Sequence, residues 1–147
     1  MSKGVTLIEV VIYIALFSLL MGTAFLSAYD ILESSGKLAV KNNTSEEANF
    51  VLRKIDWAMT GVSSFTNTPN TLHVNKYDGN QIDIKLVGTK IKLTENSGTT
   101  ATSDFITTGN ISVSSLQFTA IAGTPKGITA AAIIDGINFS ITKYMRK

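Results

Sequence analysis

Glu9 is the residue of this chain whose surroundings point most directly to a specific chemistry. The residues that directly follow Glu9, from Val10 to Tyr29, include no charged residue. At ~1.5 Å per helical residue this run spans ~30 Å, about the hydrocarbon core of a bilayer. A charge near the centre of such a segment costs on the order of 2.5–3.5 kcal/mol. Glu9 lies about two helical turns from Lys3, where the cost is lower, but its carboxylate still requires a partner.

The residues around Glu9 resemble the N-terminal signature of type IV pilins and pseudopilins. The string that carries the resemblance is Lys3-Gly4-Val5-Thr6-Leu7-Ile8-Glu9-Val10. The resemblance implies that a membrane-embedded prepilin peptidase cleaves between Gly4 and Val5 and methylates the new terminus at Val5. Glu9 is then the fifth mature residue, which in the family serves assembly through a salt bridge. Two departures from the family pattern are Val5, where Phe is usual, and a leader of only four residues.

The resemblance also implies a function. It predicts a structural subunit of a type IV-like pilus or of a type II secretion pseudopilus, assembled through the N-terminal helix. The expected partners are other pilin or pseudopilin subunits, the prepilin peptidase, an inner-membrane assembly platform with its cytoplasmic ATPase, and the lipid bilayer. Many major pilins have a C-terminal disulfide loop, and the absence of cysteine here favours a minor pilin, a pseudopilin or a lineage that lacks this loop.

Charge predicts the orientation of the segment in the cytoplasmic membrane. Lys3 precedes the apolar run, and the first charges after it are Asp30 and Glu33. The positive-inside bias places the N-terminus in the cytoplasm and the rest of this single-pass protein outside. The subunit would afterwards enter an extracytoplasmic filament.

Three other interpretations of the chain remain open. An ordinary secretory signal would be cut after Ala24 or Ala28, although the apolar run is longer than a typical signal core. A single-pass anchor could carry an extracytoplasmic binding domain that never polymerises. A DNA-uptake minor pilin would need a basic surface, and the obvious basic cluster is at the C-terminus. Its residues are Lys143, Arg146 and Lys147.

The composition favours a non-catalytic protein. The chain has 147 residues, a net charge of +2 and no cysteine, which excludes disulfides, zinc–thiolate sites and thiol nucleophiles. The single histidine, His73, alternates with apolar neighbours and is expected on the solvent face of a strand. Asp78-Gly79-Asn80 is typical of a turn rather than a calcium loop. We therefore expect no enzyme activity, no cofactor and no metal.

The elements that position these residues begin with a long helix from Thr6 to about Gly61, because no proline occurs before Pro69. A near-continuous helix with a bend is favoured over a break between Gly36 and Ser45, where Thr44 and Glu47 have the spacing of a capping box and of a possible helix restart. An apolar stripe with helical spacing then faces the domain core: Ala48, Val51, Leu52, Ile55, Met59 and Val62. The large side chains of Phe50 and Trp57 point away from this stripe. They are candidate subunit contacts, or loops of the same chain cover them.

The remaining residues show the alternation of an antiparallel sheet. Residues 71–93 predict a three-stranded meander, and residues 96–104 predict a loop. The helical stripe is expected to lie under one face of this meander, formed by Leu72, Val74, Ile82, Ile84 and Leu86. A bulge is expected at Ser114-Ser115. Residues 128–134 fit a strand or a short helix. The fold class is therefore α+β and pilin-like. The predicted parts are a leader (1–4), a membrane and polymerisation helix (5–30), its amphipathic continuation (31–62) and a sheet region (63–147).

Overall fold

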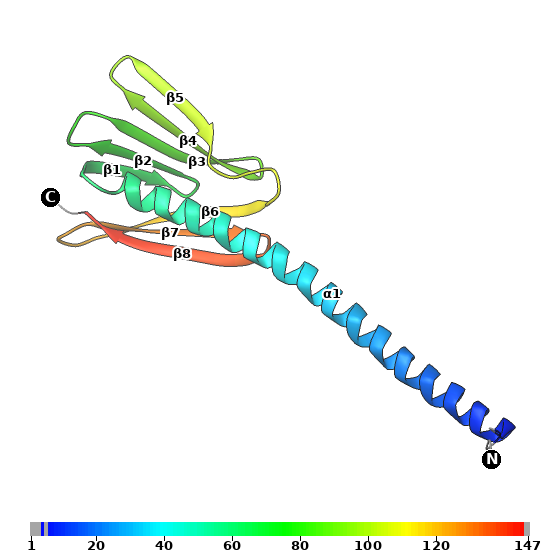
Figure 1. Ribbon diagram of the computed structural model, residues 1–147. Helices are drawn as coiled ribbons and strands as arrows, with labels where there is room; N and C mark the ends of the chain where they lie inside the picture. The colour runs from blue at the N-terminus through cyan, green and yellow to red at the C-terminus, as the bar shows by residue number, and fades with distance from the viewer. Residues whose placement is uncertain (1–3, 5, 146–147) are drawn as a thin grey trace. The chain divides into compact units, whose positions relative to one another are not determined.

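The computed structural model describes residue 4 and residues 6–145. These residues form two compact units, one up to Asn42 and one from Asn43 onward. Helix α1 (Leu7–Ala58) contributes to both units, and all eight strands of the described chain lie in the second (Figure 1). An α+β arrangement with one long N-terminal apolar helix and antiparallel sheets is therefore confirmed.

Helix α1 runs without interruption through the polar region, so the near-continuous helix that the sequence favours is confirmed and the alternative of a break is wrong. The predicted capping box is wrong, because both of its residues make tertiary contacts instead. The Thr44 hydroxyl donates to Oδ2 of Asp135 at 2.8 Å, and Oε2 of Glu47 accepts from the backbone N–H of Thr108 at 3.3 Å. Thr44 and Glu47 therefore do not cap a helix start. Their side chains instead hold the C-terminal part of α1 against the β region.

The helix ends earlier than predicted, at Ala58. Gly61 has a φ of +69°, a left-handed conformation that glycine adopts without steric cost, and the chain turns there into β1 (Val62–Thr68). Val62 is therefore the first residue of a strand and not the last of the helical stripe. It is nevertheless buried, as is Met59. Helical periodicity continued by chance into the first strand residue.

The first sheet has five antiparallel strands in the order β1-β2-β3-β4-β5. After β1 come β2 (Thr71–Lys76), β3 (Gln81–Val87), β4 (Lys90–Ser97) and β5 (Thr100–Phe105). The predicted meander corresponds to the three central strands. The predicted loop at 96–104 is wrong, because these residues form the β4–β5 hairpin. All six residues of β5 are exposed, so this edge strand has no apolar alternation for a sequence pattern to detect.

The second sheet has three antiparallel strands, β6 (Val113–Ile121), β7 (Gly127–Ile134) and β8 (Ile137–Tyr144). The predicted bulge is confirmed by a register shift between Val113 and Ser115. Residues 128–134 are a strand, which resolves the ambiguity left by the sequence. Asp135 and Gly136 both have positive φ angles, 48° and 79°, as the tight turn between β7 and β8 requires.

The core of the second unit lies between the end of α1 and both sheets, rather than under a single sheet as predicted (Figure 1). The helix supplies Ala48, Val51, Ile55 and Ala58. The first sheet contributes the predicted Leu72, Val74, Ile82 and Ile84, all with no exposed surface, and the second contributes Leu116, Phe118, Ile128 and Ile134 among others. The stripe prediction is confirmed for its buried members, while Leu52 of the stripe and Leu86 of the predicted sheet face are only half-buried.

Candidate functional site

The first turn of α1 positions Glu9. The carbonyl of Thr6 accepts hydrogen bonds from the backbone N–H groups of Glu9 (3.1 Å) and Val10 (3.3 Å), so Thr6 stands directly before the helix. A carboxylate in the first turn is favoured by the helix dipole and lies beside backbone N–H groups that lack helical partners. Gly4 is exposed. Val5, the other residue of the predicted cleavage site, lies outside the described residues, as does most of the predicted leader.

The carboxylate of Glu9 has a partner that the sequence analysis missed. The hydroxyl of Tyr13 donates a hydrogen bond to Oε1 of Glu9 at 3.1 Å. The two residues are four apart, so they lie on one face of the helix in successive turns. That spacing was available in the sequence and could have suggested the contact. Glu9 is half-buried, whereas its neighbours along the helix are exposed.

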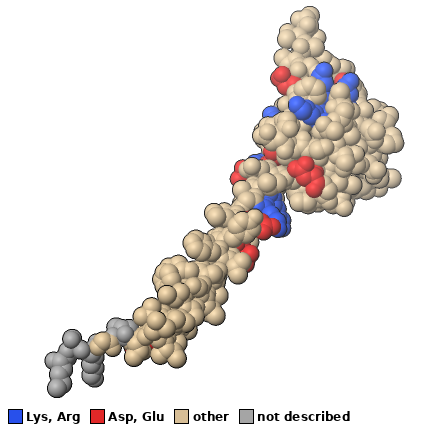
Figure 2. All heavy atoms as spheres, turned by 90° about the vertical axis from the view of Figure 1, so that its right-hand side faces the viewer, with Lys and Arg blue, Asp and Glu red and all other residues tan. Residues whose placement is uncertain are grey.

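The helix that follows Glu9 exposes its apolar side chains. Every residue from Val10 to Asn42 is exposed, including Phe17, Leu20 and Phe25. Uncharged side chains cover most of the visible N-terminal part of the helix in Figure 2. The two hydroxyls of Ser18 and Thr23 donate to the carbonyls of Ile14 (2.7 Å) and Leu20 (2.9 Å), and so are satisfied within the helix.

By length and composition α1 can cross a membrane. In water this exposed apolar surface would be strongly unfavourable, because burying apolar area stabilises by roughly 25 cal/mol per Å². A bilayer or other copies of the helix would provide the required apolar surroundings.

The comparisons with known proteins concern this same end of the chain. Residues 1–25 carry the prokaryotic N-terminal methylation motif. The match agrees with the resemblance of residues 3–10 to type IV pilins and pseudopilins, and it indicates a pilin-type subunit. A motif of this type implies contacts with other pilin subunits and with processing machinery, and together with the apolar helix it suggests membrane anchoring. No curated protein and no solved structure matches the chain.

The second unit holds the two aromatic residues proposed as subunit contacts. Phe50 and Trp57 are 42% and 39% exposed, so each is partly covered within its own unit and partly open to other molecules. Lys54 lies over both rings, with its Nζ atom 5.6 Å from the centroid of Phe50 and 5.4 Å from that of Trp57. The Nζ atom of Lys76 is 4.1 Å from the Trp57 centroid. The lysines cover part of the rings with their charged ends, which is a favourable contact between a cation and an aromatic face.

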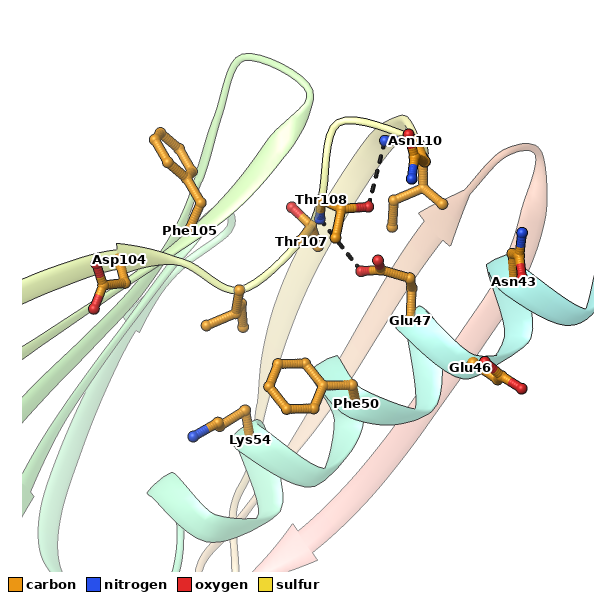
Figure 3. Close-up of a pocket in the computed structure, with 12 residues that line it drawn as sticks. Asn43, Glu46, Glu47, Phe50, Lys54, Asp104, Phe105, Thr107, Thr108 and Asn110 are labelled. Carbon is orange, nitrogen blue, oxygen red and sulfur yellow. Dashed lines mark hydrogen bonds between the residues drawn. The ribbon is translucent and has the colours of Figure 1, made fainter. Parts of the chain in front are cut away.

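An open groove of about 810 Å³ lies between this part of α1 and the segment that connects β5 to β6. Figure 3 shows Glu47, Phe50 and Lys54 on the helical side and the turn at Thr107–Asn110 on the other. The Glu47–Thr108 hydrogen bond crosses the groove at one end, while the ring of Phe105 points away from Phe50. The bond fixes the connection to the helix.

The remaining polar residues that the sequence singled out are engaged in structural pairs. His73 on β2 lies, as expected, on the face opposite the buried Leu72 and Val74, where it is half-buried and contacts Asp83, the directly opposite residue on β3. Lys143 forms an ion pair with Asp56 of α1, while Arg146 and Lys147 lie outside the described residues. Asp78 accepts from the backbone N–H of Asn80, as expected of a turn. Among the described residues no group of acidic, histidine or cysteine side chains could hold a metal ion.

Proposed function

We propose that this protein is a structural subunit of a type IV-like pilus or type II secretion pseudopilus. The single observation that carries the proposal is the methylation motif at residues 1–25, which continues into a helix with exposed apolar side chains on all sides. A helix that is apolar all round requires a membrane or a bundle of similar helices. In a filament both environments occur in succession, first the bilayer and then the helical core.

The proposed mechanism begins with cleavage after Gly4 by a prepilin peptidase, which would leave a methylated, positively charged amine at Val5. In the assembled filament this amine would pair with Glu9 of an adjacent copy. Burying either charge alone is strongly unfavourable, whereas a close pair offsets much of the desolvation cost. Glu9 would thus fix the register between helices, and the assembly platform would extract subunits from the membrane. In this proposal the protein is a building block rather than a catalyst.

The second unit would form the outer part of the filament. Its own core is complete, and its exposed Phe50 and Trp57 are the side chains that we propose to contact neighbouring subunits. Exposed aromatic residues of this size are common anchors at protein interfaces.

Co-expression with a prepilin peptidase tests the first step of this mechanism. We expect terminal mass spectrometry to show loss of residues 1–4 and methylation of Val5. Gly4→Arg should block cleavage while membrane insertion remains intact, and Gly4→Ala serves as the mild control at the same position. A mature terminus at Phe25 or Tyr29 would instead identify an ordinary secretory signal and would contradict the filament function.

A further inference from the structure

The hydrogen bond from Tyr13 to Glu9 is a side-chain contact at the apolar end of α1 that the proposed assembly mechanism does not yet use. Side chains of a helix lean toward its N-terminus, so the ring of Tyr13 extends over the turn that carries Glu9. The hydroxyl reaches Oε1 at 3.1 Å. Among the described residues no side chain or backbone group donates a hydrogen bond to Oε2 of Glu9.

We propose that Tyr13 is a positioning residue for the assembly pair made by Glu9. It holds one carboxylate oxygen by a neutral hydrogen bond and leaves the other oxygen for the terminal amine of a neighbouring copy. This inference rests on the proposed function, because it concerns the same contact between subunits. Tyr13 is thus a second residue, besides Glu9, that determines how Glu9 pairs with the amine of a neighbouring copy.

A carboxylate in an apolar medium needs hydrogen-bond donors for both of its oxygens. Its two oxygens accept several hydrogen bonds, and each missing bond raises the cost of removing the ion from water. One amine from a neighbour supplies few of these bonds. The phenolic hydroxyl adds a donor without adding a charge, so it lowers the cost of burying Glu9 and does not replace the amine.

The same bond also orders the Glu9 side chain before assembly. A free glutamate samples several rotamers, and fixing them at the moment of contact reduces the free energy gained. With Oε1 held by Tyr13 in the preceding membrane state, less of this entropy remains to be lost. An alternative role for Tyr13 is that of an aromatic residue at the membrane–water interface, which depends on the ring and on depth but not on Glu9.

Tyr13→Phe in the full chain, expressed with the peptidase and assembly machinery, tests the inference. We expect the ratio of filament-incorporated to membrane-retained subunit to fall severalfold, because the carboxylate then enters the apolar core with one donor fewer and loses its rotamer freedom only at the moment of contact. The total amount in the membrane should stay unchanged. Tyr29→Phe is the matched control, because it removes the same hydroxyl from the same helix, and it should leave the ratio unchanged.

A double-mutant cycle separates positioning from packing. Glu9→Asp withdraws the carboxylate by one methylene and should weaken assembly only in part. In that background Tyr13→Phe should have little further effect, because the hydrogen bond is already lost. An equal loss in both backgrounds, a loss in Tyr29→Phe as well, or an unchanged ratio in Tyr13→Phe would each overturn the inference. Normal assembly of Glu9→Leu would instead overturn the proposed role of Glu9 itself, and that of Tyr13 with it.

Discussion

The two units of this protein treat their apolar side chains in opposite ways. In the first unit every residue from Val10 to Asn42 is exposed, although the segment up to Tyr29 has no charged residue. In the second unit the apolar residues of α1 alternate with polar ones at helical spacing, and the buried ones have almost no exposed surface. One uninterrupted helix thus begins as a segment that needs apolar surroundings and ends as part of a folded core.

This difference separates the part of the chain that buries its own apolar side chains from the part that needs other molecules to bury them. The second unit satisfies its own apolar surface and so has the features of an independently stable domain. The first unit leaves its apolar surface for a bilayer or for other helices. Substitutions in the first unit should therefore change localisation and assembly, and those in the second should change folding stability.

The largest expected effect that separates the two units is that of Glu9→Leu. Loss of the carboxylate would leave the amine of a neighbour buried without its partner, which costs on the order of 3–5 kcal/mol. We expect filament incorporation to fall by roughly a hundredfold or more, as measured in sheared filaments against total membrane protein. Membrane insertion should be retained or improved, because a costly polar group leaves the apolar segment.

Thermal unfolding of the second unit is the control for that prediction. It should be the same in Glu9→Leu as in the parent, since Glu9 lies in the first unit. If Glu9→Leu forms filaments as well as the parent, the anchored binding domain becomes the better interpretation of the chain. If it lowers the stability of the second unit, the separation of roles between the units is wrong.

Ile55→Ala should have the largest effect within the second unit. Ile55 has no exposed surface and lies in the cluster that joins α1 to both sheets. Its truncation should lower the free energy of unfolding by ~2–5 kcal/mol in a soluble fragment that begins near Leu32, measured by denaturant titration. Phe50→Ala is the matched control on the same helix and should cost less than ~1 kcal/mol, because Phe50 is 42% exposed. Equal losses would show that the faces of the helix are assigned wrongly.

A smaller loss is expected from Asp135→Ala in the turn between β7 and β8. Its carboxylate accepts from the Thr44 hydroxyl and from the backbone N–H of Ser112, both at 2.8 Å. We expect a loss of about 1–3 kcal/mol, the range for hydrogen bonds to an exposed charged group together with strain at a positive φ. Asp135→Asn keeps an acceptor and tolerates this φ, so it should lose less than half as much. If the two variants were equally unstable, the negative charge would be the important feature.

Much of the second unit follows from local patterns in the sequence. The stripe of Val51 and Ile55 was predictable, because the helical period places both on one face. The bulge near Ser114 was predictable too, since the apolar alternation changes phase there. Strand β5 was not predictable, since an exposed edge strand of threonine, serine and alanine has the composition of a loop. It is identified as a strand only by its pairing with β4.

The sequence by itself determined the N-terminal features, because their signals are local. Gly4, Glu9 and the apolar run follow one another at fixed spacings, and the membrane imposes a length that can be counted along the chain. Tertiary structure alone decided the role of Thr44 and Glu47. Their spacing fits a helix start equally well. In the structure Thr44 binds Asp135, 91 positions away, and Glu47 binds Thr108, 61 positions away, so both residues hold the helix against the β region. Contacts over such separations depend on how the sheets fold back onto the helix, which no local pattern records.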